Sequence, residues 1–208
     1  MSIRGTFDTH EENKIYIIGG KGVGKTSFFH LIFEDKFIDD LDPSKPGIIK
    51  SEYTKGKIKF TIKDLSDDET FEKTKILTNE LEEVILIFVM FALNNKSSFV
   101  YAKNLIHLIK SNILNNKDLN IILLGNKFDL GVKNKENIKV SKKEINQYIY
   151  KIDHLYYYDI SCKDGHNIKD VKQIIDDIEI GDEDDDNDDG RENFEENHGN
   201  EDRSCLIN

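Results

Sequence analysis

The stretch Gly19-Gly20-Lys21-Gly22-Val23-Gly24-Lys25-Thr26 fits the pattern G-x-x-x-x-G-K-[ST]. An apolar run over residues 14–18 precedes it and predicts a short buried strand, while residues 27–33 begin a helical pattern. Glycines let the backbone curl so that several N–H groups point at one anion, and the helix N-terminus adds a partial positive charge. A glycine-rich turn that binds nothing is the alternative, and the strand and helix around the stretch argue against it. The stretch therefore predicts a phosphate loop that binds a nucleoside triphosphate.

Two side chains of this loop are predicted to act directly on the ligand. Lys25 would reach the β- and γ-phosphates, and the Thr26 hydroxyl would ligate Mg²⁺. We expect further nucleotide contacts from the rest of the loop and the residue after it: Gly20, Lys21, Gly22, Val23, Gly24 and Ser27.

Composition and charge narrow the class of protein. The chain has 208 residues, enough for one domain, with 38% hydrophobic and 33% charged residues. Residues 179–208 hold 13 acidic and two basic side chains, a net charge of −11 that equals the net charge of the whole chain, so residues 1–178 are neutral. No basic surface for nucleic acid is indicated. The two cysteines, Cys162 and Cys205, are too few for a disulfide framework and are typical of a reducing cytosol.

Apolar runs alternate with helical patterns along residues 13–180. A hairpin is predicted from residues 48–54 and 57–63, buried strands at 84–91 and 120–125, a last strand at 154–160, and helices at 97–114, 141–150 and 168–180. Residues 133–137 are expected to form a charged loop. This order predicts an α/β fold of the P-loop NTPase type, with a six-stranded, mostly parallel sheet and helices on both faces.

Two further motifs directly follow predicted strands. Asn126-Lys127-Phe128-Asp129 comes after the strand that ends at Gly125, and Ser161-Cys162-Lys163 after the strand that ends near Ile160. Taken alone, the first motif could be a polar turn in a chain rich in Asn and Lys. In order and approximate spacing with the phosphate loop, the motifs resemble those of the Ras superfamily of small GTPases. Residues 91–99 and 161–168 are also similar to passages of Rab and Ras proteins.

This resemblance implies a guanine pocket. Asp129 would accept hydrogen bonds from the base N1–H and its exocyclic amine, which adenine cannot supply. The stem of Lys127 would lie over the base, and Asn126 would tie this loop to the phosphate loop. Cys162 would present its backbone N–H to the guanine O6, between Ser161 and Lys163. Phe37, twelve residues after Lys25, would stack on the other side of the base.

The chain departs from the family at the predicted Mg²⁺ site. The resemblance implies a Thr nineteen residues after Lys25, where this sequence has Ser44, a hydroxyl that can still ligate Mg²⁺. An alternative alignment places Lys45 there, and the ligand is then lost. Asp64 keeps the family's indirect role at the metal, through the metal's bound water.

A larger departure lies at Asp67 and Asp68. The resemblance implies a Gly at the first position, which meets the γ-phosphate, and at the second a Gln that orients the attacking water. Two carboxylates beside a phosphate of like charge predict slow hydrolysis. Two interpretations of Lys21 stay open. Its positive charge offsets that of Asp67 across the γ-phosphate, or Lys21 is merely a solvated lysine and the loop with Asp67 and Asp68 moves away from the phosphate.

The two ends of the chain fall outside the predicted domain. Residues 1–12 form a polar lead, and residues 181–204 an acidic linker that we expect to be disordered. Residues 205–208, Cys-Leu-Ile-Asn, fit the pattern for prenylation of Cys205. The expected location is the cytoplasmic face of a membrane, in exchange with the cytosol.

The function predicted from these features is a guanine-nucleotide switch of the Rab/Ras type that binds GTP or GDP with Mg²⁺ and hydrolyses GTP slowly. Residues 38–47 and 65–78 would contact effector and exchange proteins, in membrane traffic or signalling, and the chain would be a monomer. The alternative is a pseudo-GTPase that binds the nucleotide without useful hydrolysis. A P-loop kinase or ATPase would leave Asn126–Asp129 unexplained.

Overall fold

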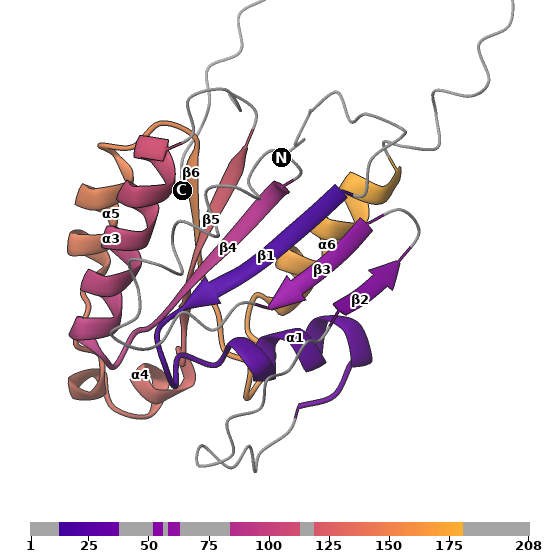
Figure 1. Ribbon diagram of the computed structural model, residues 1–208. Coiled ribbons are helices and arrows are strands. Elements are labelled where there is room, and N and C mark those ends of the chain that lie inside the picture. Colours follow the sequence, from indigo (N-terminus) through magenta and orange to yellow (C-terminus); the bar gives the residue numbers. More distant parts are fainter. Residues whose placement is uncertain (1–12, 38–51, 56–57, 63–83, 113–118, 181–208) are drawn as a thin grey trace, which may run out of the picture.

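A computed structural model describes residues 13–37, 52–55, 58–62, 84–112 and 119–180. They contain one six-stranded sheet in the order β2-β3-β1-β4-β5-β6 (Figure 1). Its strands are β1 (Asn13–Gly19), β2 (Glu52–Lys55), β3 (Ile58–Ile62), β4 (Val84–Ala92), β5 (Asn120–Asn126) and β6 (Leu155–Asp159). Only the β2–β3 pair is antiparallel, whereas the other four pairs are parallel. The predicted α/β fold with a mostly parallel sheet is confirmed.

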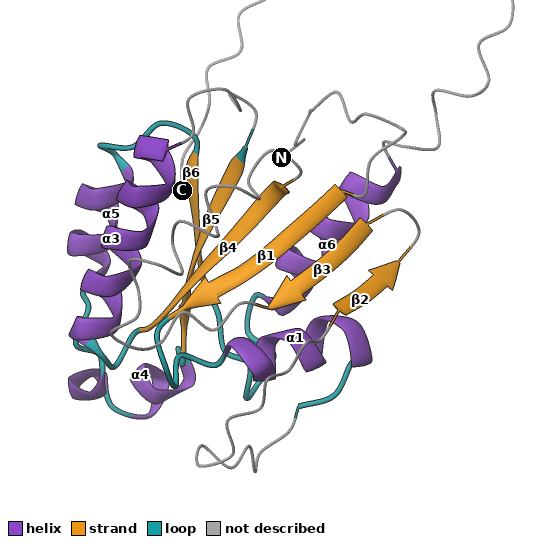
Figure 2. Ribbon diagram, viewed as in Figure 1, coloured by secondary structure: helices purple, strands orange, loops and turns teal. Residues whose placement is uncertain are grey.

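Helices cover both faces of this sheet (Figures 1 and 2). They are α1 (Lys25–Glu34), α3 (Lys96–Asn112), α4 (Asp129–Lys133), α5 (Lys142–Ile149) and α6 (Ile168–Ile180), with a 3₁₀ helix, η2, at Lys135–Asn137. The views show α1 and α6 on one side of the sheet and α3 and α5 on the other. The prediction of a plain loop at residues 133–137 is wrong, because the Asn134 side chain caps a 3₁₀ turn by accepting from the backbone N–H of Glu136.

The side chains of the central strands divide into two cores. Ile17 of β1, Phe88 of β4 and Ile122 of β5 are paired in register and belong to the core under α1 and α6. The next residues along these strands, Ile18, Val89 and Leu123, belong to the core under α3 and α5. Because both faces are buried, these strands read as continuous apolar runs.

The helices are built as their sequences predict. Ser141 caps α5 by accepting from the backbone N–H of Glu144, whose carboxylate accepts from the N–H of Ser141 in return. In α6 the apolar residues of one stripe are buried: Ile168, Val171, Ile174 and Ile175. Within the described ranges, none of the helices combines the length and apolar character needed to span a membrane.

Parallel pairing brings the carboxyl ends of β3, β1, β4, β5 and β6 to one edge of the sheet. β1 ends at Gly19, β4 at Ala92, β5 at Asn126 and β6 at Asp159. Ligands of open α/β sheets bind at this edge. Each predicted motif among the described residues begins at one of these strand ends or within two residues of it.

Candidate functional site

The phosphate loop has a backbone that only glycine accommodates at two of its positions. Gly19 has φ 149°, and a Cβ there would lie 2.4 Å from the carbonyl oxygen of Met90. Gly24 has φ 102°, and a Cβ there would lie 2.2 Å from Nδ2 of Asn126. Both glycines are therefore required for the close approach of the loop to β4 and β5. At Gly22, with φ 72°, a Cβ would meet nothing within 4 Å, so the loop leaves open space on this side.

Lys25 places a positive charge inside this curl. Its Nζ donates to the carbonyl oxygens of Gly19 (2.9 Å) and Gly20 (2.8 Å), and the residue is only 5% exposed. Helix α1 begins at Lys25, and its next residue is the predicted Mg²⁺ ligand Thr26. A buried ammonium group and a helix N-terminus at one loop are a combination that suits a phosphate chain.

Asn126 connects three segments at the edge of the sheet. Its Nδ2 donates to the carbonyl oxygen of Val23 (2.9 Å), and its Oδ1 accepts from the backbone N–H of Cys162 (3.1 Å). Asn126 is 3% exposed, so these bonds are shielded from water. This one amide thus links the phosphate loop, the end of β5 and the segment after β6.

Asp129 is held by a second buried contact. The hydroxyl of Ser161 donates to Oδ1 of Asp129 (3.1 Å), and the residues are 0% and 8% exposed. The backbone N–H of Phe128 donates to the carbonyl oxygen of Ile160 (3.1 Å), so side-chain and backbone bonds join the same two loops. Lys127 has φ 70°, and this left-handed backbone turns the chain from β5 into α4.

Cys162 is buried in this part of the site. Burial raises the pKa of its thiol to about 12, so the side chain stays neutral. Its backbone N–H, predicted to bind the guanine O6, donates to Asn126 in the structure, and binding to O6 would require that donor to be shared or exchanged. The adjacent Lys163 is exposed.

The other predicted site residues are only partly covered by the structure. Phe37 is half-buried and packs against the core on the α1 side. Ser44, Asp64, Asp67 and Asp68 lie outside the described residues, as do Cys205 and the segments 38–47 and 65–78. Of the predicted Mg²⁺ ligands, Thr26 alone lies within the described ranges.

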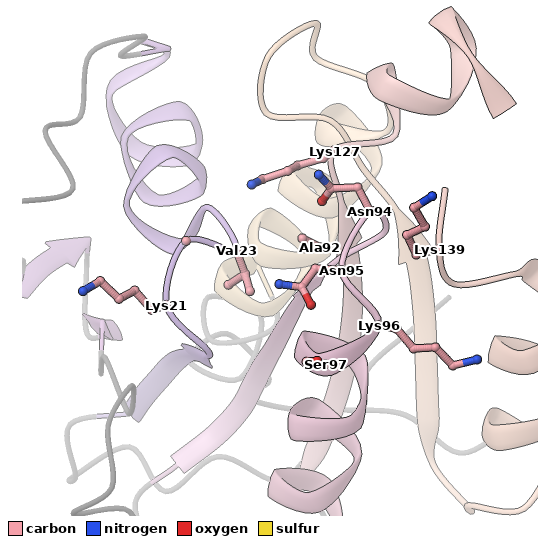
Figure 3. Close-up of a pocket in the computed structure, with 10 residues that line it drawn as sticks. Lys21, Val23, Ala92, Asn94, Asn95, Lys96, Ser97, Lys127 and Lys139 are labelled. Carbon is pink, nitrogen blue, oxygen red and sulfur yellow. The ribbon is translucent and has the colours of Figure 1, made fainter. Parts of the chain in front are cut away.

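A pocket of about 470 Å³ opens beside the phosphate loop. Figure 3 shows Asn94 and Asn95, from the turn after β4, facing the loop that carries Val23, with Lys127 beside them. Lys96 points away from the pocket, and its Nζ lies 2.8 Å from the carboxylate of Glu144. Sequence reasoning assigned no role to Asn94 and Asn95, although they lie in the passage 91–99 that resembles Rab and Ras proteins.

Sequence reasoning also missed Phe128 and His166. Their rings stack with a centroid separation of 4.1 Å and an interplanar angle of 7°. The aromatic residue between Lys127 and Asp129 was the available signal, because aromatic side chains bury large areas and pair with other rings.

The groups at this edge fit a guanine nucleotide. The glycine loop offers backbone donors and open space at Gly22, and Lys25 supplies a buried cation for phosphate oxygens. Asp129 is a buried carboxylate held by Ser161, and a carboxylate can accept from two adjacent N–H groups. The fold and this site define an α/β P-loop domain of the GTPase type.

Comparison with known proteins agrees with this class. The sequence model described as "Ras family" matches residues 14–179. The chain is 30% identical to the Ras-related protein Rab-32D of Dictyostelium discoideum, over 84% of this chain and 77% of that protein. It is 26% identical to the Ras-related protein R-Ras of Rattus norvegicus, over 79% and 73%. Its match to the GTPase RhebL1 of Mus musculus, 30% identical, covers 56% of this chain and 63% of that protein.

The chain belongs to the Ras family of small GTPases. Members of this family are GTP-binding switches that bind GTP or GDP, typically with Mg²⁺, and interact with effector and exchange proteins. The resemblance on which the guanine pocket was predicted is confirmed at the level of the family.

Proposed function

We propose that this chain binds GTP and GDP at the edge formed by the phosphate loop, Asn126–Asp129 and Ser161–Lys163. The observation that carries the proposal is the buried Asn126 amide, which bonds to Val23 at 2.9 Å and to Cys162 at 3.1 Å. These bonds preorganise the phosphate-binding and base-binding segments as one site, so binding does not have to order them.

We call the phosphate loop, Gly19–Thr26, together with Ser27 the phosphate half of the site. In this half, Lys25 and the loop backbone would hold the ligand. The Lys25 ammonium lies against two loop carbonyls and would exchange them for β- and γ-phosphate oxygens. The proposed nucleotide contacts continue over Gly20–Ser27. When bound, Mg²⁺ would neutralise charge on these oxygens, with Thr26 as a direct ligand and Ser44 and Asp64 in the roles predicted from the sequence.

We call the segments Asn126–Asp129 and Ser161–Lys163 the base half of the site. In this half, Asp129 would select guanine. Ser161 fixes one carboxylate oxygen, and the fixed carboxylate would accept from a base with two adjacent N–H donors. An adenine ring would supply neither of the two donors to this buried carboxylate, which would keep only its bond from Ser161, and that loss is the source of the selectivity. Lys127 and Phe37 would enclose the base from its two faces.

Hydrolysis of GTP is proposed to be slow. The support is the sequence, which has carboxylates at Asp67 and Asp68 where the family has Gly and Gln, and both oppose the charge of the γ-phosphate. A pseudo-GTPase that holds GTP or GDP without useful hydrolysis is the second candidate, favoured by the same two residues. The rate of a single turnover distinguishes the two.

The cellular role is proposed from the family and the sequence. Residues 38–47 and 65–78 would contact effector and exchange proteins of membrane traffic or signalling, and the chain would act as a monomer. A prenyl group on Cys205 would hold it at the cytoplasmic face of a membrane, in exchange with the cytosol. One lipid with an acidic linker provides weak, reversible attachment.

Isothermal titration calorimetry with Mg²⁺ tests the binding proposal. Protein stripped of nucleotide should bind GDP at least a hundredfold more tightly than ADP, on the order expected for a hydrogen-bonded base pocket. Equal affinities for the two nucleotides would contradict the proposal.

A further inference from the structure

The two loops of the base half are joined by an aromatic stack. Phe128 lies between Lys127 and Asp129, and His166 lies in the turn that follows Ser161–Lys163. Their rings are nearly parallel, at 7°, with centroids 4.1 Å apart. The contact therefore bridges the two segments that are proposed to hold the guanine.

His166 is tied into the turn that orients Asp129. Its backbone carbonyl accepts from the N–H of Ser161 (3.2 Å), and its own N–H donates to Oδ1 of Asp164 (3.2 Å). The hydroxyl of Ser161 accepts from the N–H of Asp164 (3.3 Å) while donating to Asp129 (3.1 Å). A shift of the His166 ring would thus be transmitted through this turn to Ser161 and on to the Asp129 carboxylate.

The carboxylate of Asp159 lies near the imidazole of His166. Nε2 of His166 lies 3.6 Å from Oδ2 of Asp159, beyond hydrogen-bond distance, and this atom is buried with no hydrogen-bond partner. The turn adds the carboxylate of Asp164, whose pKa is lowered, against the opposing effect of desolvation, by hydrogen bonds with Ser161 and the backbone of His166 and by the nearby imidazole. Charged residues on the adjoining segments, in sequence order, are Lys127, Asp129, Lys163, Lys169 and Asp170.

Protonation would strengthen both contacts of the ring. An imidazolium would pair with Asp159 and, lying over the face of Phe128, would add a cation–π attraction. A neutral ring gains neither and leaves Nε2 without a good partner. Histidine is the side chain whose unperturbed charge change falls between pH 5 and 8, which sets the pH range in which we test this pair.

We infer that Phe128 and His166 are a positioning pair that clamps the two guanine-contacting loops together, and that protonation of His166 tightens the clamp and slows nucleotide release. Neither side chain needs to touch the nucleotide, since both act through Asp129 and Ser161. This inference rests on the proposed guanine-nucleotide binding and adds to it a pH-dependent lifetime of the bound state.

The test is the release rate of a fluorescent N-methylanthraniloyl GDP from the full chain, chased with excess GDP between pH 5.8 and 8.0. Wild-type release should slow by about three- to tenfold as pH falls, the scale of one exposed cation–π contact and ion pair. His166→Phe retains a stacked ring without a charge, so it should release at the wild-type rate at pH 8.0 and show no slowing at low pH. His166→Ala should release several-fold faster at every pH.

Two further variants separate this mechanism from other causes. Asp159→Asn removes the carboxylate that faces Nε2 and should reduce the pH dependence. His154→Asn, a change at an exposed histidine with φ 56° that Asn tolerates, should keep the full wild-type profile. The thermal unfolding temperature of each nucleotide-loaded variant is measured as a control, to check that every variant is folded under the conditions of the release assay.

The outcomes distinguish a failure of this inference from a failure of the proposed guanine-nucleotide binding. A chain that loads no guanine nucleotide overturns the proposed function. A chain that loads it, yet releases it at one rate across the pH range in wild type, or slows equally in His166→Phe, overturns the inference alone. A pH profile that disappears in His154→Asn would also overturn it.

Discussion

The side-chain amide of Asn126 donates to the carbonyl oxygen of Val23 across 103 positions of sequence, at 2.9 Å. At this point the phosphate loop and the end of β5 come so close that a Cβ on Gly24 would lie 2.2 Å from the same amide nitrogen. The phosphate half and the base half of the site are therefore built as one unit rather than as two adjacent loops.

Asn126→Ala should weaken both the fold and nucleotide binding. The change leaves the Val23 carbonyl and the Cys162 N–H buried without partners. Each unpaired group lowers the free energy of unfolding by about 1–3 kcal/mol. We expect the free energy of unfolding to fall by roughly 2–6 kcal/mol on the same basis, and GDP affinity to fall at least about tenfold. Urea unfolding and calorimetry measure the two effects. Asn146→Ala, at an exposed position of α5, is the matched control and should change neither.

Asp129→Asn should change the base that is bound. Guanine presents N–H donors to this position, whereas xanthine carries a carbonyl at C2 and needs a donor from the protein. The variant should lose GDP affinity by roughly a hundredfold and gain affinity for xanthosine diphosphate. Competition against a fluorescent nucleotide measures both. A variant that still prefers GDP would show that another residue reads the base.

Cys162 should be unreactive in the folded protein. With a pKa of about 12, its thiolate fraction at pH 8 is roughly a thousandfold below that of a free cysteine. In a Cys205→Ser protein, iodoacetamide should therefore modify Cys162 only after denaturant is added, as followed by intact-protein mass. Rapid modification of the native chain would mean that the segment after β6 opens readily.

Asp68→Gln should speed GTP hydrolysis. An amide can both accept from and donate to a bridging water, and it lacks the charge that opposes the γ-phosphate. We expect an increase of at least about tenfold in single-turnover hydrolysis for Asp68→Gln with Asp67→Gly. Asp153→Asn removes an exposed carboxylate elsewhere and should have no effect. If wild type matches or exceeds the double variant, these two carboxylates do not limit the reaction.

The acidic segment should weaken membrane attachment. Anionic headgroups repel the acidic side chains between Asp182 and Glu196, so prenylated protein should bind anionic vesicles more tightly as salt is added. Neutral replacements in that segment should raise vesicle binding without altering GDP affinity. Sedimentation with vesicles measures both proteins. Cys205→Ser should stay in the supernatant, and its co-sedimentation would mean that another part of the chain anchors it.

The sequence predicted the sheet and helices because their signals are local. The run Val84–Ala92 is apolar on both faces, as a central parallel strand must be, and Ser141 with Glu144 marks the start of α5. Short elements held by single side chains carry no such period. For this reason the 3₁₀ turn capped by Asn134 was not predicted, and the five residues of α4 are too few to show a helical period.

The site was predicted only as far as its motifs extend. Glycine spacing and the polar residues after each strand indicate which segments meet, because parallel strands end at one edge. They carry no information on contacts between those segments. The stack of Phe128 on His166 and the approach of Nε2 to Asp159 depend on the relative placement of two loops, which no local pattern specifies.

The central claim is that this chain binds guanine nucleotide at the joined phosphate and base halves. The most direct measurement is to denature the purified protein and identify the released nucleotide by chromatography, with a Lys25→Ala protein treated identically. We predict GDP or GTP in amounts close to one per chain from wild type and a large loss from the variant. An adenine nucleotide from wild type, or no nucleotide together with no binding of added GDP, would contradict the claim.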